Sequence, residues 1–305
     1  MTTPKVPATT RQKPERDQRR STLDLSPGTA KWIDRGLFAV LLASYLFVVL
    51  LPFYWIILSS FTPRNQIFRI PPRYWFSEFT FDNYQALADN IPLLEYMVNS
   101  LIFATGASLL SVGAAFLASY PLARMQFRGA NLIFAAFIIS IALPQIGTLV
   151  PLFELFKNLD LINTRHGLIL LQASLITPFT VWIMVPFLQQ IPREIEEAAI
   201  VDGARIYHII GQILFPVMRP ALATMFIINF IIAWNELLYP LVFAQREKVL
   251  SVGLVELAVE PTAGGGRPWD LLSAMSVIMI MPVLLLVLVF QKLIVAGLTR
   301  GALKG

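Results

Sequence analysis

The residues best suited to a specific task lie in one polar segment, residues 191–203, between two long apolar stretches. Its three glutamates are Glu194, Glu196 and Glu197. Carboxylates favour the positive end of a helix dipole, Pro192 suits a first helical position, and Gly203 can end a helix in a left-handed conformation. The segment therefore predicts a short, well-capped helix.

A second short helix is expected over residues 204–215, stopped by Pro216. Residues 191–216 would then form a helix-turn-helix lying across the membrane surface. Small and apolar residues recur along one face of the first helix: Ile195, Ala198, Ala199, Asp202 and Ile206. Three carboxylates match an anionic lipid surface poorly, so this face favours docking of a protein over a helix resting among headgroups.

Polar side chains within the apolar stretches form a second group of candidates. They are Asn99, Gln145, Gln172, Asn229, Asn235 and Glu236. Polar groups are costly in lipid and tend to face a bundle interior or a cavity, so these six could line a pathway. For each of them the alternative is a hydrogen bond between helices.

The sequence gives little support for a metal site or for a phosphate-binding site. The chain has no cysteine and only two histidines, His166 and His208, so neither a metal site nor a cofactor is expected. No Gly-x-x-x-x-Gly-Lys-Ser/Thr sequence occurs, so we expect no ATP hydrolysis by this chain itself. The basic residues flank apolar stretches instead of forming a stripe, which argues against nucleic acid.

The elements that must position these residues are membrane spans. The chain of 305 residues is 56% hydrophobic and 14% charged, outside the usual range for a soluble domain. A bilayer core takes roughly 20 helical residues to cross. Six stretches qualify, at about 37–61, 96–122, 132–156, 167–188, 221–243 and 271–296. We expect an all-α polytopic membrane domain over 31–305, preceded by a disordered basic cytoplasmic tail over 1–30.

Basic residues resist translocation and therefore indicate orientation. If the N-terminus lies inside, the inner segments hold sixteen of the 24 Lys and Arg residues. This favours both termini inside, with residues 191–216 in the cytoplasm. Two long connections, 62–95 and 244–270, would then lie outside. Prolines within spans, among them Pro144, are expected either to bend helices or to be static kinks.

The polar segment resembles the cytoplasmic coupling loop, or EAA motif, of ABC importer permeases. The resemblance is carried by Glu197-Ala198-Ala199, Gly203, Ile213 and Pro216; the family pattern has leucine where this chain has Phe215. Phe81-Asp82-Asn83-Tyr84, Leu122-Ala123-Arg124 and the final stretch 297–305 are similar to carbohydrate-uptake permeases of the maltose-transporter type, in particular its shorter permease.

This resemblance implies a binding-protein-dependent importer in a prokaryotic plasma (inner) membrane. The expected partners are a second permease, an ABC ATPase dimer and an extracytoplasmic solute-binding protein. The chain would form half of a translocation pathway for a sugar or sugar-like solute. The residues expected to couple it to the ATPase are Glu197, Ala198, Ala199, Asp202, Gly203, Ile213 and Pro216.

Three other functions are compatible with the residues. A secondary transporter or half-transporter would also have six helices with internal prolines, although no span carries an acidic cluster for a coupling ion. A membrane scaffold or sensor could use the small-residue face to bind a cytoplasmic partner. An ABC permease for another solute would share the coupling motif.

Overall fold

The structure is a computed structural model that describes residues 27–302 except 73, 77 and 260–266. The predicted tail, 1–30, therefore lies almost entirely outside the described residues. Every regular element within the described residues is helical, which confirms the all-α class. The chain divides into two units, residues 1–53 and 54–305. Helix α1 (Pro27–Ser60) contains the first apolar span, Arg35–Ser60.

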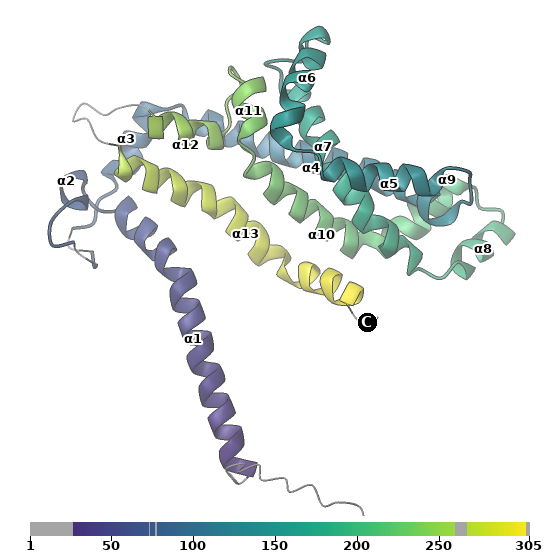
Figure 1. The fold of residues 1–305 in the computed structure, drawn as a ribbon, viewed down its shortest axis with the longest axis horizontal. Helices are drawn as coiled ribbons and strands as arrows, with labels where there is room; N and C mark the ends of the chain where they lie inside the picture. The colour runs from purple at the N-terminus through teal and green to yellow at the C-terminus, as the bar shows by residue number, and fades with distance from the viewer. Residues whose placement is uncertain (1–26, 73, 77, 260–266, 303–305) are drawn as a thin grey trace, which may run out of the picture. The chain divides into compact units, whose positions relative to one another are not determined.

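Three long helices form the centre of the larger unit: α4 (Leu93–Arg124), α7 (Arg165–Gln189) and α10 (Phe215–Trp234). Helix α4 packs against both α7 and α10, and α10 also packs against α13 (Trp269–Ala302), as Figure 1 shows. Their inward side chains make two apolar cores, one towards each end of the helices. The predicted second, fourth and sixth spans correspond to α4, α7 and α13.

The stretch predicted as the third span, about 132–156, is built from two helices. Helix α5 (Ala130–Ile141) and helix α6 (Gln145–Asn158) meet at a bend of 105°. Pro144 lies at the bend as the residue before α6. Proline disfavours a helical conformation in the residue before it, which ends α5 here. The described residues thus hold five helices able to span a membrane, or six if this pair is one broken span.

The prediction that Pro216 ends a separate short helix was wrong. Helix α9 (Ile206–His208) continues through a π-helical segment, η1 (Ile209–Leu214), directly into α10. A π-helical turn shifts the hydrogen-bond register, which accommodates a residue without an N–H group, and Pro216 stands in the first turn of α10. The fifth span consequently covers Ile206–Trp234 instead of 221–243, and residues 238–243 form a separate helix, α11 (Leu238–Phe243).

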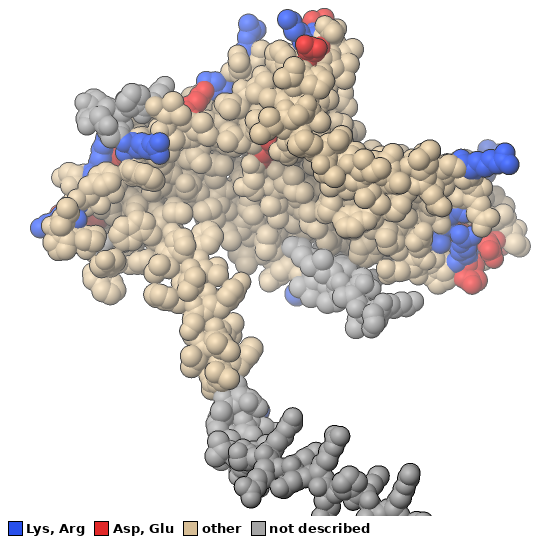
Figure 2. Space-filling model, in the orientation of Figure 1, with Lys and Arg blue, Asp and Glu red and all other residues tan. Residues whose placement is uncertain are grey.

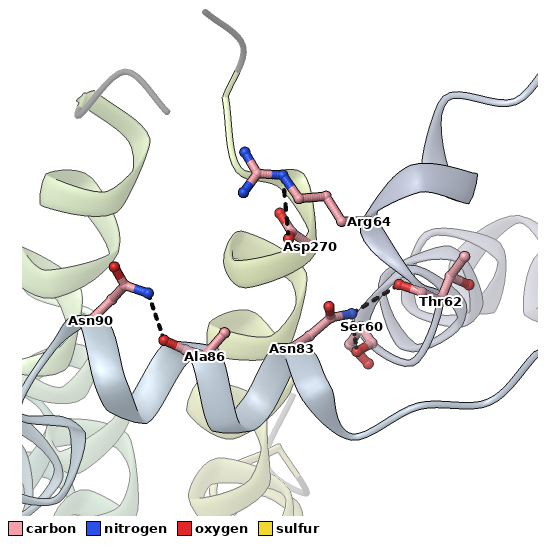
Figure 3. A network of polar contacts seen from close by, with 7 residues as sticks. All are labelled: Ser60, Thr62, Arg64, Asn83, Ala86, Asn90 and Asp270. Carbon is pink, nitrogen blue, oxygen red and sulfur yellow. Dashed lines mark hydrogen bonds and ion pairs between the residues drawn. The ribbon is translucent and has the colours of Figure 1, made fainter. Parts of the chain in front are cut away.

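The two long connections are partly helical. The first contains α2 (Arg64–Ile67) and α3 (Asp82–Asn90), and the second contains α12 (Leu250–Val259). Figure 3 shows how α3 is fastened to the end of α1: the buried Asn83 donates from Nδ2 to the carbonyl oxygens of Ser60 and Thr62, at 2.9 Å each. In the same region Arg64 forms an ion pair with Asp270 at 3.8 Å, joining α2 to α13.

Candidate functional site

Helix α8 (Glu194–Val201) forms in the polar segment, as predicted. It begins two residues after Pro192 instead of at it. The backbone N–H groups of Glu196 and Glu197 donate to the carbonyl oxygen of Arg193 at 2.9 and 3.0 Å, which starts the first turn. The glutamates therefore do lie at the positive end of the helix dipole.

Gly203 ends α8 in the left-handed conformation that the sequence predicts, with φ of +84°. Its N–H group donates to the carbonyl oxygen of Ile200 at 3.0 Å, and the next N–H group, of Ala204, donates to that of Ala199 at 2.9 Å. This pair of bonds is a Schellman motif, which satisfies the last carbonyl groups of a helix. The Schellman turn requires a left-handed conformation at residue 203, which glycine adopts without strain.

A buried ion pair fastens α8 to the end of α4. Arg124 Nε lies 2.7 Å from Glu196 Oε1, and both side chains are less than a tenth exposed. Arg124 also donates from Nη2 to the carbonyl oxygen of Ile191 at 2.8 Å, which ties in the turn after α7. Sequence analysis missed this pair, because Arg124 is one of the basic residues that flank the apolar stretches and Glu196 is explained as a partner of the helix dipole.

The outer face of α8 is exposed to solvent and largely apolar. Apolar side chains exposed on α8 or just after it are Ile195, Ile200, Val201 and Ile206, with Val201 87% exposed. Ala198, Asp202 and Gly203 are exposed beside them, whereas Ala199 is half-buried against the core. In the view of Figure 2 the Lys, Arg, Asp and Glu side chains gather mainly at the ends of the helices, including the end where α8 lies in Figure 1.

Asn229 joins three central helices. Its Nδ2 donates to Ser111 Oγ at 3.2 Å and to Thr180 Oγ1 at 2.9 Å, and all three side chains are buried. These residues stand on α10, α4 and α7. The contact is the interhelical hydrogen bond that the sequence analysis gave as the alternative to lining a pathway.

Asn99 and Gln172 are buried with unsatisfied acceptors. Asn99 donates from Nδ2 to the carbonyl oxygen of Lys248 at 3.0 Å, which holds the start of α4 to the segment before α12. Asn99 Oδ1 and Gln172 Oε1 have no hydrogen-bond partner among the described residues. Buried acceptors of this kind are unusual and mark places where another group could bind.

The last two candidates lie at the end of α10. Asn235 is exposed and donates from Nδ2 to the carbonyl oxygen of Ile231 at 2.8 Å. Glu236 Oε1 accepts a hydrogen bond from the N–H group of Leu238 at 3.0 Å, at the first turn of α11. Both have local structural contacts, and Glu236 stabilises the start of a helix.

One cavity of about 610 Å³ lies beside the bend between α5 and α6. It contains only one of the six candidates, Gln145. Polar and aromatic lining residues include Gln145, Thr148, Ser174, Phe179 and Tyr239. Thr148 Oγ1 and Tyr239 Oη are 3.2 Å apart, within hydrogen-bonding distance. Sequence reasoning missed Thr148, Ser174 and Tyr239, since a hydroxyl in an apolar stretch carries a weak signal.

Comparisons with known proteins place this arrangement among transport proteins. Residues 28–300 match the family described as binding-protein-dependent transport system inner membrane component. The trehalose/maltose transport system permease protein MalG of Thermococcus litoralis is 33% identical over 261 residues, 85% of this chain and 92% of that one. The sulfoquinovosyl glycerol transport system permease protein SmoH of Agrobacterium fabrum is 32% identical over 289 residues, 93% and 100% of the two chains.

A solved structure has the same fold. It is the crystal structure of a bacterial ABC transporter involved in the import of the acidic polysaccharide alginate, with a TM-score of 0.75 and 21% sequence identity. The match covers 86% of this chain and 97% of that chain.

Proposed function

Because this chain belongs to the family of inner membrane components of binding-protein-dependent transport systems, we propose that it supplies half of the translocation pathway of a carbohydrate importer. Its relatives named for trehalose/maltose and sulfoquinovosyl glycerol transport support a sugar or sugar-like solute. The cavity beside Gln145 offers amide, hydroxyl and aromatic groups, which are the groups that bind sugars.

The second part of the proposal is that α8 docks into a separate ABC ATPase dimer. The main support is that one face of α8 is exposed while the opposite face is bound to α4. Val201 and its apolar neighbours are exposed, while Glu196 on the opposite side is locked to Arg124. Because α8 is bound to α4, a displacement of α8 by the ATPase would also move α4. Such a movement would shift the spans between inward- and outward-facing states.

The expected assembly also contains a second permease and an extracytoplasmic solute-binding protein. The experiment is an affinity purification of the chain from its native membrane in mild detergent, followed by mass spectrometry. Recovery of an ATPase, a second permease and a solute-binding protein supports the proposal. Recovery of the chain alone, under conditions that preserve other complexes, contradicts it and favours a secondary transporter.

The docking surface is tested by Glu197→Lys, with Glu194→Lys as the matched control. Both glutamates are exposed in the first turn of α8, so the two changes have a similar effect on the helix dipole. Only Glu197 belongs to the coupling motif. We expect Glu197→Lys to insert normally but to lose bound ATPase, or to hydrolyse ATP without transport. Equal behaviour of the two variants would refute the assignment.

A further inference from the structure

The connection after α1 exposes a dense group of large apolar side chains. Its exposed members are Phe68, Ile70, Tyr74, Trp75, Phe76, Phe79 and Phe81, and we call these residues the aromatic loop. Trp75 is 79% exposed and Ile70 is 93% exposed. Single exposed apolar residues are common, but seven large ones within fourteen residues favour a surface that binds a protein or a membrane.

The aromatic loop folds back along the end of α1. The hydroxyl group of Tyr54 donates a hydrogen bond to the carbonyl oxygen of Tyr74. The rings of Trp55 and Tyr74 lie 6.1 Å apart, and Trp75 shares a small pocket with Trp55 and Leu58. Tyr74 and Trp75 therefore lie beside the last turns of the span and not beyond its end.

The depth of this contact follows from helix geometry. Tyr54 is six residues before Ser60, which ends α1, so it lies about 9 Å back along the axis at 1.5 Å per residue. The apolar span Arg35–Ser60 has 26 residues and is about 39 Å long, roughly 9 Å longer than a bilayer's hydrocarbon core. Arg35 is charged and belongs at the edge of the hydrocarbon core, which puts this excess at the Ser60 end and places Tyr74 and Trp75 level with the boundary between hydrocarbon and headgroups.

The loop is fixed by contacts within the chain. Phe61 stacks on Phe79 with ring centroids 4.6 Å apart, and the N–H group of Thr80 donates to the carbonyl oxygen of Phe61 at 3.0 Å. Asn83, with its two bonds to the end of α1, holds the other side. The aromatic side chains are therefore presented outward by a framework that needs no partner to form.

We infer that the aromatic loop inserts into the lipid headgroup region of the bilayer at the end of α1 and anchors that end of the span. Tryptophan and tyrosine are enriched at this depth, since one part of the ring is apolar and another can hydrogen-bond. Arg69, exposed at the edge of the loop, suits contact with lipid phosphate. The inference is independent of ATPase docking and requires only that α1 crosses the membrane.

The chain contains no cysteine, so single cysteines can be labelled uniquely. Trp75→Cys and Ile70→Cys, each with a nitroxide label, are reconstituted in vesicles of phosphatidylethanolamine and phosphatidylglycerol. The full-length chain is used with its co-purifying subunits, whose own cysteines are replaced by serine. Gln85→Cys, at an exposed position of α3, serves as the water-facing control. Paramagnetic relaxation by oxygen reports lipid exposure, and relaxation by a water-soluble nickel chelate reports solvent exposure.

We expect the oxygen-to-nickel ratio at positions 70 and 75 to exceed that at position 85 several-fold. A ratio at 70 and 75 equal to the control would place the loop in water and overturn the inference. Low relaxation by both reagents would show that a protein subunit covers the loop, which overturns it as well. Neither substituted side chain is buried, so loss of folding is not expected to obscure the result.

Discussion

The guanidinium group of Arg124 and the carboxylate of Glu196 meet at 2.7 Å inside the protein, although one stands at the end of α4 and the other in α8. Neither charge has appreciable access to water. An isolated buried charge is costly, so each of these groups depends on the other. The pair makes α8 and α4 a single mechanical unit on the side that faces away from the exposed apolar surface.

Removal of one charge of this pair should therefore be harmful, and removal of both much less so. We expect Arg124→Met to lower the free energy of unfolding by about 3 kcal/mol, because Glu196 is left buried without a counter-charge. The double variant Arg124→Met/Glu196→Leu should recover most of that loss. Unfolding by denaturing detergent in mixed micelles measures both. Additive losses in the double variant would show that the two charges are not coupled.

The left-handed residue after α8 gives a second prediction. A Cβ atom at Gly203 would meet nothing within 4 Å, so Gly203→Ala introduces no clash and its cost is conformational. We expect a loss of about 1 kcal/mol in the same unfolding measurement. Gly211→Ala is the control, because that site is equally open but has no positive φ. Equal effects at the two glycines would contradict the explanation.

Asn229 distinguishes a structural role from a pathway role. Replacement by alanine removes its bonds to Ser111 and Thr180, and each interhelical bond of this type contributes about 0.6 kcal/mol. We expect Asn229→Ala to destabilise the protein by about 1 kcal/mol while solute uptake per folded transporter stays unchanged. Asn235→Ala, at an exposed position, should alter neither quantity. Loss of uptake with unchanged stability would assign Asn229 to the pathway.

The cavity beside Gln145 is the place where solute contact should be measurable. We expect Gln145→Ala to slow uptake about fivefold, since one lost hydrogen bond to a passing solute is worth about 1 kcal/mol. Insertion and ATPase association should be unaffected, because Gln145 is exposed on α6, and α6 lies apart from α8 (Figure 1). The assay is uptake of radiolabelled sugar into vesicles. A normal rate would remove the cavity from the pathway.

Hydrophobic length was sufficient to locate α4, α7 and α13, because the thickness of the hydrocarbon core sets how many apolar residues a span needs. The sequence also predicted the left-handed Gly203, since few other residues tolerate that conformation. The same reasoning failed at Pro216, where the preceding π-helical turn allows the helix to continue. Proline shows where a hydrogen bond is missing, but the packing of the neighbouring helices decides whether the axis bends.

Side-chain partners were harder to predict than helices. Polar character alone singled out Asn229 and Glu236, yet it could not show that one bonds to two other helices and the other to the first turn of α11. Arg124 and Glu196 are distant in the chain, and each has a sufficient local explanation. Contacts of this kind depend on how α4 and α7 pack, which a single sequence does not record.

The helix is continuous from α9 through η1 to α10, so a movement at its α9 end is passed along the whole of α10. A helical rod resists bending, whereas a turn of four residues, Asp202–Arg205, separates α8 from that rod. The short turn that contains Gly203 is therefore the part of this connection without helical hydrogen bonding along its length. If a partner displaced α8, a longer or more flexible turn would take up the displacement by changing its own conformation. A shorter turn would pass the displacement on as a rotation of α10.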